Sequence, residues 1–207
     1  MLTTLPNNGT SRGLSLSLSL LLALPLALLI PAAETFAADT GFASPTTSGA
    51  PNEWANGANA LLSDNNNANT SDEATQGYRD FGFSVPVDSV IDGIEVALEA
   101  EDEADGGCEL KARLSWDDGS QFTDRKTVTL TGTKTIHTLG SSSDKWGHEW
   151  LLSEFNDANF MVEVRYNDPG SACGNNDDAL LDHVQARVHY TAPTGRIIIE
   201  KQTNPDG

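Results

Sequence analysis

Apolar and polar residues alternate with a period of two along most of the chain between Glu53 and Ala192. In CELKARLSW, every second residue from Cys108 to Trp116 is apolar and the residues between them are polar or charged. Successive side chains of a strand point to opposite faces of a sheet, so this alternation predicts strands with one buried and one solvated face. The same pattern recurs in FMVEVRY (160–166) and LDHVQARVHY (181–190), and in shorter form around 81–85, 94–98, 128–130 and 136.

Seven or eight such strands, separated by turn-rich loops such as EDEADGG and WDDGS, predict two antiparallel sheets packed face to face. Parallel sheets would need crossover helices, and only EWLLSEFND has the pattern of one or two helical turns. The predicted fold class is all-β, an antiparallel β-sandwich of jelly-roll type, with an immunoglobulin-like strand order as the alternative. Residues 54–62 are expected to form the first strand or a cap over one end.

The first 37 residues have the anatomy of a secretory signal peptide. Arg12 lies before an apolar run, Leu14–Ile30, and Thr35-Phe36-Ala37 is a small-x-small cleavage site. The alternative is a membrane anchor, but the run is barely long enough to span a bilayer and no basic residue follows it closely. We therefore expect cleavage after Ala37 and a secreted or cell-surface protein.

The remaining chain divides by composition into three parts. Residues 38–52 are small and polar with two prolines, which indicates a flexible lead-in. Residues 53–192 have the length of a single sandwich domain. Residues 193–207 are expected to be a linker and the first strand of a truncated following domain, because a β-branched run is followed by turn residues with no strand to pair with. Donation of that strand to a neighbouring subunit and a frayed tail are the alternatives.

The charge of the chain argues against two classes of partner. The formal net charge is −18, and removal of residues 1–37 takes away one Arg and one Glu, so the whole charge stays on the mature chain. Nucleic acid and anionic membrane surfaces would be repelled. The expected partners are surface glycans or neighbouring subunits, with no membrane contact beyond the cleaved signal.

The two cysteines, Cys108 and Cys173, are an even count in an exported chain, which favours a disulfide. The bond would close a loop of 65 residues. Two buried thiols are the alternative.

The acidic loops suggest one cofactor. Calcium binds carboxylate and carbonyl oxygens that converge from loops, and 64–72 and 175–182 are rich in Asp and Asn. Neither loop has the EF-hand spacing, so the best ligand candidates for a structural calcium are Asp64, Asp177 and Asp178. Loops of this composition more often cap their own backbone.

Carbohydrate binding would use aromatic rings that stack on sugars, for which Trp146, Trp150 and Tyr78 are the candidates. The alternative is that these rings pack in the core. No catalytic signature is present after the predicted signal peptide: residues 38–207 have no G-x-S-x-G and no H-E-x-x-H, and no pair of acids is singled out for glycoside hydrolysis. We therefore expect no enzymatic activity and name no catalytic residue.

Four segments together resemble a β-sandwich module of bacterial secreted and surface proteins and of phage structural proteins. They are EWANGANALLSDNNNA, YRDFGFSVPVDSVIDGIEVALEA, DKWGHEWLLSEFNDANFMVEV and LLDHVQARVHYT, and the resemblance covers about residues 41–192. That module carries no assigned active site, so the resemblance implies architecture and setting.

The tail, GRIIIEKQTNPDG, resembles the first strand and turn of a prealbumin-like surface repeat of the SpaA or Cna B type. In such repeats a lysine of the first strand can form an isopeptide bond, and Lys201 holds a comparable place; the alternative is a solvated lysine. Together these resemblances suggest a non-enzymatic exported structural or adhesion protein, the N-terminal sandwich of a larger stalk. A carbohydrate- or calcium-binding module is the alternative, and a domain associated with a glycoside hydrolase a remote one.

Overall fold

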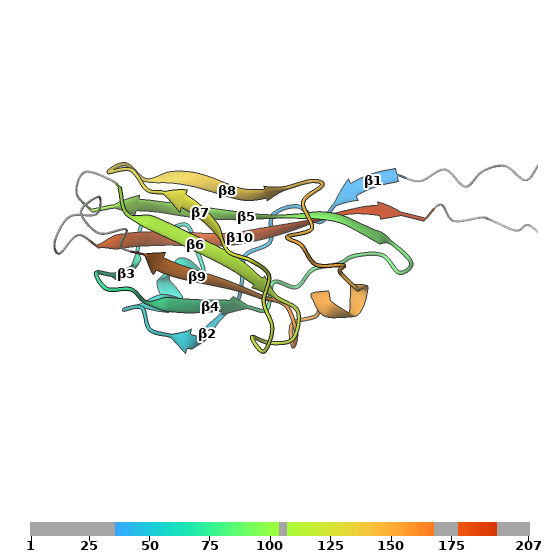
Figure 1. Cartoon of the computed structure of the whole chain (residues 1–207), viewed down its shortest axis with the longest axis horizontal. Coiled ribbons are helices and arrows are strands. Elements are labelled where there is room, and N and C mark those ends of the chain that lie inside the picture. Colours follow the sequence, from blue (N-terminus) through green and yellow to red (C-terminus); the bar gives the residue numbers. More distant parts are fainter. Residues whose placement is uncertain (1–35, 104–106, 168–177, 194–207) are drawn as a thin grey trace, which may run out of the picture. The chain divides into compact units, whose positions relative to one another are not determined.

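The alternating segments form the strands of two antiparallel sheets in the computed structural model, which describes residues 36–103, 107–167 and 178–193 (Figure 1). The first sheet, sheet A, has the order β1-β10-β5-β8, and β3 pairs with the other half of β10. The second, sheet B, has the order β2-β4-β9-β6-β7. Sheet A contains β1 (Phe36–Asp39), β3 (Ala68–Thr70), β5 (Val90–Asp102), β8 (Thr135–Ser141) and β10 (Ala179–Ala192). Sheet B contains β2 (Thr47–Asn52), β4 (Thr75–Arg79), β6 (Glu109–Ser115), β7 (Lys126–Thr129) and β9 (Met161–Asn167).

The strand pairing is that of a jelly roll. Strands β6 and β7 form the innermost hairpin, and around it β5 pairs with β8, β4 with β9 and β3 with β10. This nested set is a long hairpin wrapped so that successive pairs fall alternately in the two sheets. The predicted antiparallel jelly-roll sandwich is confirmed, and the immunoglobulin-like order is excluded.

The core lies between the sheets and is made by the predicted inward residues. In β6 the residues Leu110, Ala112 and Leu114 are fully buried, while the residues between them face outward. The same holds for Val162 and Val164 of β9. Alternation along each strand thus places one apolar face against the opposite sheet.

Residues 81–85 are not the strand that the sequence predicts. Asp80 and Gly82 have φ angles of 60° and 63°, and such left-handed residues interrupt an extended ladder. The chain leaves sheet B after Arg79, and the Phe81 and Phe83 rings stack on each other with centroids 5.4 Å apart. The apolar alternation here reflects core packing without a strand.

The expected flexible lead-in at 38–52 is also wrong, because it contributes strands to both sheets. Its first two residues belong to β1, and its last six form β2 at the edge of sheet B. The 54–62 segment forms a cap and no strand. It contains the 3-10 helix η1 (Gly57–Ala60). The one predicted helical turn is present as η2 (Leu152–Phe155).

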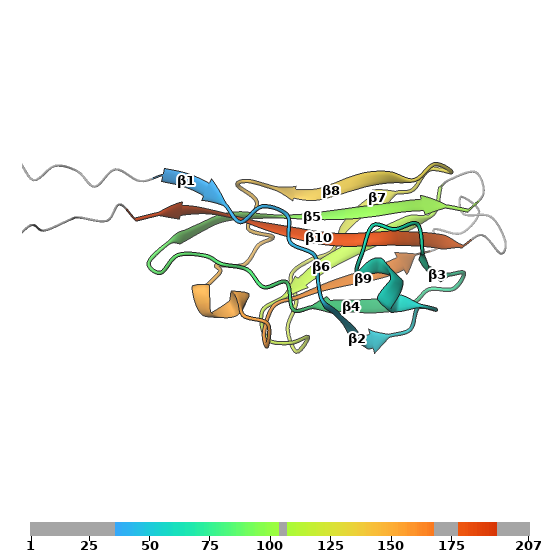
Figure 2. The ribbon, with the colours of Figure 1, turned by 180° about the vertical axis from the view of Figure 1, so that it is seen from behind.

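The two ends of the sandwich differ in what lies there. At one, the β1 end, the first and last strands pair, with Phe36 opposite Ala192 (Figure 2). At the other, the β3 end, β3 pairs with the start of β10, Thr70 opposite Ala179. None of the helices in the described ranges has the length and apolarity needed to cross a bilayer. Residues 1–35, which hold most of the predicted signal peptide, and the tail from residue 194 lie outside the described residues.

Candidate functional site

The loop at 64–72, which is rich in Asp and Asn and is one of the two predicted calcium-binding loops, contacts the side-chain ammonium group of Lys134. Lys134, just before β8, places Nζ 3.0 Å from Asn67 Oδ1 and 3.4 Å from Asn65 Oδ1. The same nitrogen lies 3.3 Å from Oδ2 of Asp182. Three oxygens from two separate parts of the chain therefore converge on one cation at the β3 end.

Asp182 reaches this position because of a bulge in β10. The register between β10 and β5 shifts between Leu181 and His183, so Asp182 is the extra residue in the strand. Asp182 is only 1% exposed, and the backbone N–H of Asp64 donates a hydrogen bond to its Oδ1 at 3.4 Å. A carboxylate so deeply buried is costly unless a cation compensates it, and Lys134 supplies that cation.

The predicted calcium ligands do not meet in one site among the described residues. Asp64 accepts a hydrogen bond from the Asn66 backbone, and hydrogen bonds from Asn66, helped by Lys134, hold the pKa of Asp64 below its ordinary value. Asp178 accepts from Asn69 Nδ2 at 2.8 Å. Within the described ranges no three His, Cys, Asp or Glu side chains are placed to hold a metal. Asp177 lies outside the described residues.

The three aromatic residues predicted to stack on sugars are all buried, so that prediction is wrong for them. Tyr78 is fully buried and donates its hydroxyl to the Gly57 carbonyl at 3.2 Å, and burial raises its pKa. Trp146 donates Nε1–H to the Ile94 carbonyl, and Trp150 to that of Lys145, both at 2.8 Å. Their polar atoms are satisfied inside the protein, which is the usual role of a buried Tyr or Trp.

The exposed ring of Phe42 and the half-buried rings of Phe122 and Trp116 are each covered on one face by another side chain. The Arg187 guanidinium lies 4.4 Å from the centroid of Phe42, and that of Arg113 lies 3.5 Å from Phe122. The Trp116 ring is stacked at 3.9 Å on His148. A sugar ring would have to displace these groups to stack on the covered faces.

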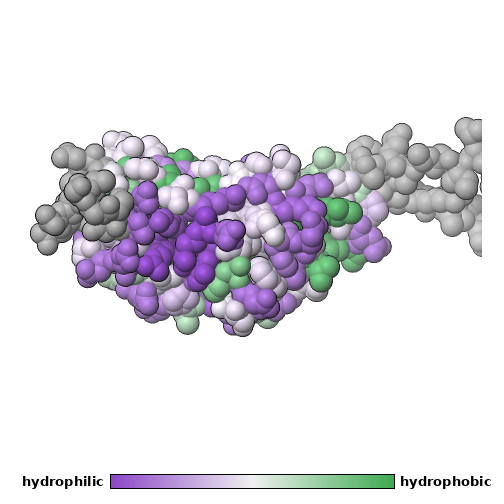
Figure 3. Space-filling view, viewed as in Figure 1, coloured by the Kyte–Doolittle hydropathy of each residue, from purple (hydrophilic) through white to green (hydrophobic). Residues whose placement is uncertain are grey.

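Ion pairs cover the outer face of sheet B, where hydrophilic side chains gather over β6 and β9 (Figure 3). Glu163 of β9 is 2% exposed and accepts from Nε and Nη2 of Arg113 at 2.6 and 2.9 Å. Arg125 donates to the same carboxylate. This buried acid is therefore compensated by two guanidinium groups, one of them bidentate, a geometry that fixes both partners.

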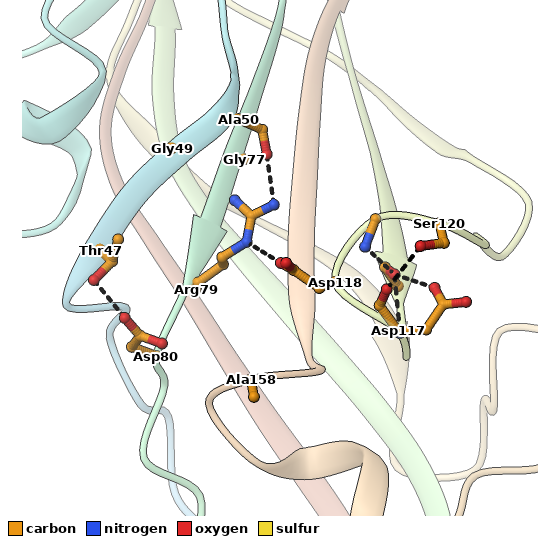
Figure 4. Close-up of polar contacts among 12 residues, drawn as sticks. Thr47, Gly49, Ala50, Gly77, Arg79, Asp80, Asp117, Asp118, Ser120 and Ala158 are labelled. Atoms are coloured by element: carbon orange, nitrogen blue, oxygen red, sulfur yellow. Dashed lines mark hydrogen bonds and ion pairs between the residues drawn. The ribbon is translucent and has the colours of Figure 1, made fainter.

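Arg79 joins the edge of this face to the β6–β7 loop (Figure 4). Its Nε lies 2.5 Å from Asp118 Oδ1, and its Nη2 donates to the Ala50 carbonyl at 2.5 Å. The side chain crosses Gly77, where a Cβ atom would lie 2.9 Å from both Arg79 Nη1 and the Ala50 oxygen. Glycine is thus required for this clamp, which holds edge strand β2 to the sheet.

A cavity of about 470 Å³ opens at the β1 end. It lies where β1, β5 and β10 meet the segment after β8. Its lining residues are Ala37, Ala38, Asp39, Asp92, Ser142, Ser143, Lys145 and His189. Sequence reasoning missed these residues, since they come from four separate parts of the chain.

Asp182 and Lys134 were missed as well, but one signal was readable. The inward residues Leu181 and Val184 are three apart, which breaks the period of two and indicates an extra residue between them. Cys108 is buried; Cys173 and Lys201 lie outside the described residues, so the disulfide and the isopeptide lysine stay predictions.

No protein-family model and no curated protein matches the chain. Among the solved structures that match is that of TmCBM61 in complex with β-1,4-galactotriose, with a TM-score of 0.35 and 12% sequence identity. The similarity covers 64% of this chain and 77% of that one. A likeness at this level carries no argument about function.

Proposed function

We propose that the chain is a non-enzymatic structural or adhesion module that is exported and displayed at a cell surface. The observation that carries this proposal is the pairing of β1 with β10, in which Ala38 and Asp39, the residues after the predicted cleavage site, lie opposite Tyr190 and His189. A sandwich whose first and last strands lie side by side can be held at one end and present the other. The predicted signal peptide and the acidic surface agree with export.

The internal contacts support a structural module whose edge strands are secured by side chains. In each sheet one edge strand is held by a side-chain hydrogen bond in addition to its backbone hydrogen bonds. Thr40 Oγ1 accepts from the Val188 N–H at 3.1 Å beside β1, and Arg79 clamps β2 through the Ala50 carbonyl. The nested pairing joins residues far apart in sequence and includes the long β10, which pairs with β1, β3 and β5.

Accessibility of two epitopes on intact producing cells tests the proposal. One short epitope is inserted after Asp72, in the exposed loop at the β3 end, and a matched one after Asp88, in the exposed loop at the β1 end. We expect antibody to bind the Asp72 epitope on intact cells and the Asp88 epitope more weakly, because the β1 end faces the attachment. Staining of neither epitope on intact cells, with both detected after lysis, would overturn export to the surface.

A further inference from the structure

The cavity at the β1 end has the chemistry of a small-molecule site that the aromatic residues do not provide. Its volume of about 470 Å³ falls in the range of known ligand sites, roughly 300–1,000 Å³. Side chains that accept and side chains that donate hydrogen bonds both line it: Asp39 and Asp92 accept, while Lys145 donates. Ser142 and Ser143 can do either.

The two carboxylates are held in place by the chain. Asp39 Oδ1 accepts from the backbone N–H of Gly41 at 2.7 Å, and Asp92 Oδ2 accepts from Thr191 Oγ1 at 2.7 Å. Each of these contacts uses one carboxylate oxygen, so the second oxygen of each is left to a ligand. Groups fixed in advance lose little entropy on binding.

The charges of the lining select against anions. In the full chain, with residues 1–37 in place, two aspartates and one lysine give a formal charge of −1 when His189 is neutral. Lys145 also lies 3.0 Å from Glu149, and His189 Nε2 lies 3.3 Å from Glu95, so both basic groups already face a carboxylate. A phosphate or carboxylate ligand would meet a net negative surface.

We propose that this cavity binds a neutral polyhydroxylated ligand, a sugar residue of a glycan. A hydroxyl group both donates and accepts, so a vicinal pair can donate to Asp39 or Asp92 and accept from Lys145. Ala38 supplies a small apolar surface for the C–H groups of the sugar. With no Phe, Tyr or Trp ring among the lining residues the affinity is low, with a Kd on the order of 1 mM. This inference does not depend on the proposed surface role.

The test is a titration of the purified full chain with galactose, glucose, mannose and N-acetylglucosamine, followed by backbone amide NMR shifts. We expect at least one sugar to give saturable shifts centred on Asp39, Asp92 and 142–145. Asp39→Asn and Asp92→Asn each keep the oxygen that accepts the internal hydrogen bond, and they should weaken binding about fivefold or more. Ser142→Tyr, at an exposed position, should fill the cavity and abolish the shifts.

Asp124→Asn, in the separate cavity beside Trp146, is the matched control and should leave the affinity unchanged. The inference is overturned by an absence of saturable shifts with all four sugars, by shifts centred on another face, or by an affinity that Asp39→Asn and Ser142→Tyr leave unchanged. The amide spectrum of each variant without sugar shows whether it is folded.

Discussion

The two ends of the sandwich are closed by different chemistry. At the β1 end, five aromatic rings pack together with neighbouring centroids 5.2–6.1 Å apart. They belong to Phe81, Phe83, Trp150, Phe155 and Phe160. At the β3 end, the loops are held by polar contacts around the Lys134 ammonium and the buried Asp182 carboxylate.

This difference determines how firmly the loops at each end are fixed in position. An aromatic cluster gains stability from buried area and needs no directional partner. A buried carboxylate stabilises only when its partner is in place, so it fixes the position of the loop that surrounds that partner. The β3 end therefore keeps a polar, exposed loop surface in a defined arrangement, while the β1 end is closed by apolar packing without directional polar contacts.

The largest expected effect is on the aromatic end. Phe160 is 2% exposed and contacts four of the other rings, so Phe160→Ala should lower the free energy of unfolding by about 3–5 kcal/mol. Denaturant unfolding followed by Trp fluorescence measures this loss. Ile136→Ala, at a side chain 64% exposed, is the control and should change stability by less than about 0.5 kcal/mol. A loss below 1 kcal/mol for Phe160→Ala would contradict the assignment of the cluster as the closing core of this end.

The predicted disulfide would add a covalent constraint beside the polar end, where Cys108 is buried at the start of β6. For a 65-residue loop, the chain-entropy model gives about 4 kcal/mol, and measured losses are commonly about 2–4 kcal/mol. We expect thiol titration of the denatured, unreduced chain to find no thiol, and unfolding in reductant to show that loss. Two titratable thiols would contradict the disulfide.

Removal of the internal cation should cost less than removal of Phe160. Lys134→Met leaves the Asp182 carboxylate buried without its charge partner, and breaking a buried pair in this way costs about 3–5 kcal/mol. The Lys134 side chain is 17% exposed, so water compensates in part and we expect about 2 kcal/mol. Lys126→Met is the matched control, because its pair with Asp144 is about one-third exposed, and it should cost less than about 1 kcal/mol. Equal losses for the two variants would show that the Lys134 pair is an ordinary surface pair.

Much of the fold was readable from the sequence because strong alternation leaves few choices. The patterns at 108–116, 160–166 and 181–190 correspond to β6, β9 and β10 with bounds that differ by at most two residues. The edge strands β1, β2 and β3 were not readable. Most of their residues are small or polar, with low strand propensity, and they are strands because β4 and β10 supply hydrogen-bonding partners.

The site was much less predictable than the fold. The acidic loop at 64–72 was recognised as a place for a cation, but the cation is Lys134, which lies 67 residues after Asn67. Its carboxylate partner is buried by a bulge, and a bulge reverses the face on which a strict alternation would place a side chain. The composition of the loop shows that carboxylate and amide groups are present. Whether the Asp182 carboxylate meets Lys134 depends on the register of β10.

The smallest expected effect is a loss of stability in mild acid, from His137 and His183 near the polar end. Burial lowers the pKa of both, and for His183 the charges of Glu99 and Asp182 offset part of that shift. As the pH falls through the ordinary value of about 6.5, the unfolded chain takes up protons that the folded chain still resists, so stability falls from there down to the lower folded-state pKa. Glu95 and Asp144 contribute only at lower pH: burial alone would raise each pKa, but Arg187 with His189 and Lys126, respectively, hold them below the ordinary value.

Denaturant unfolding at pH 7.5 and 5.5 measures this loss. His183→Gln should reduce the difference between the two pH values, because glutamine does not titrate and can still hydrogen-bond to Ser44, whose Oγ lies 2.8 Å from His183 Nε2. His137→Gln should reduce the difference further. Substitution of both histidines with no change in the pH dependence would show that the acid sensitivity of this end arises from its carboxylates, and the polar network would then lose stability only below about pH 4.5.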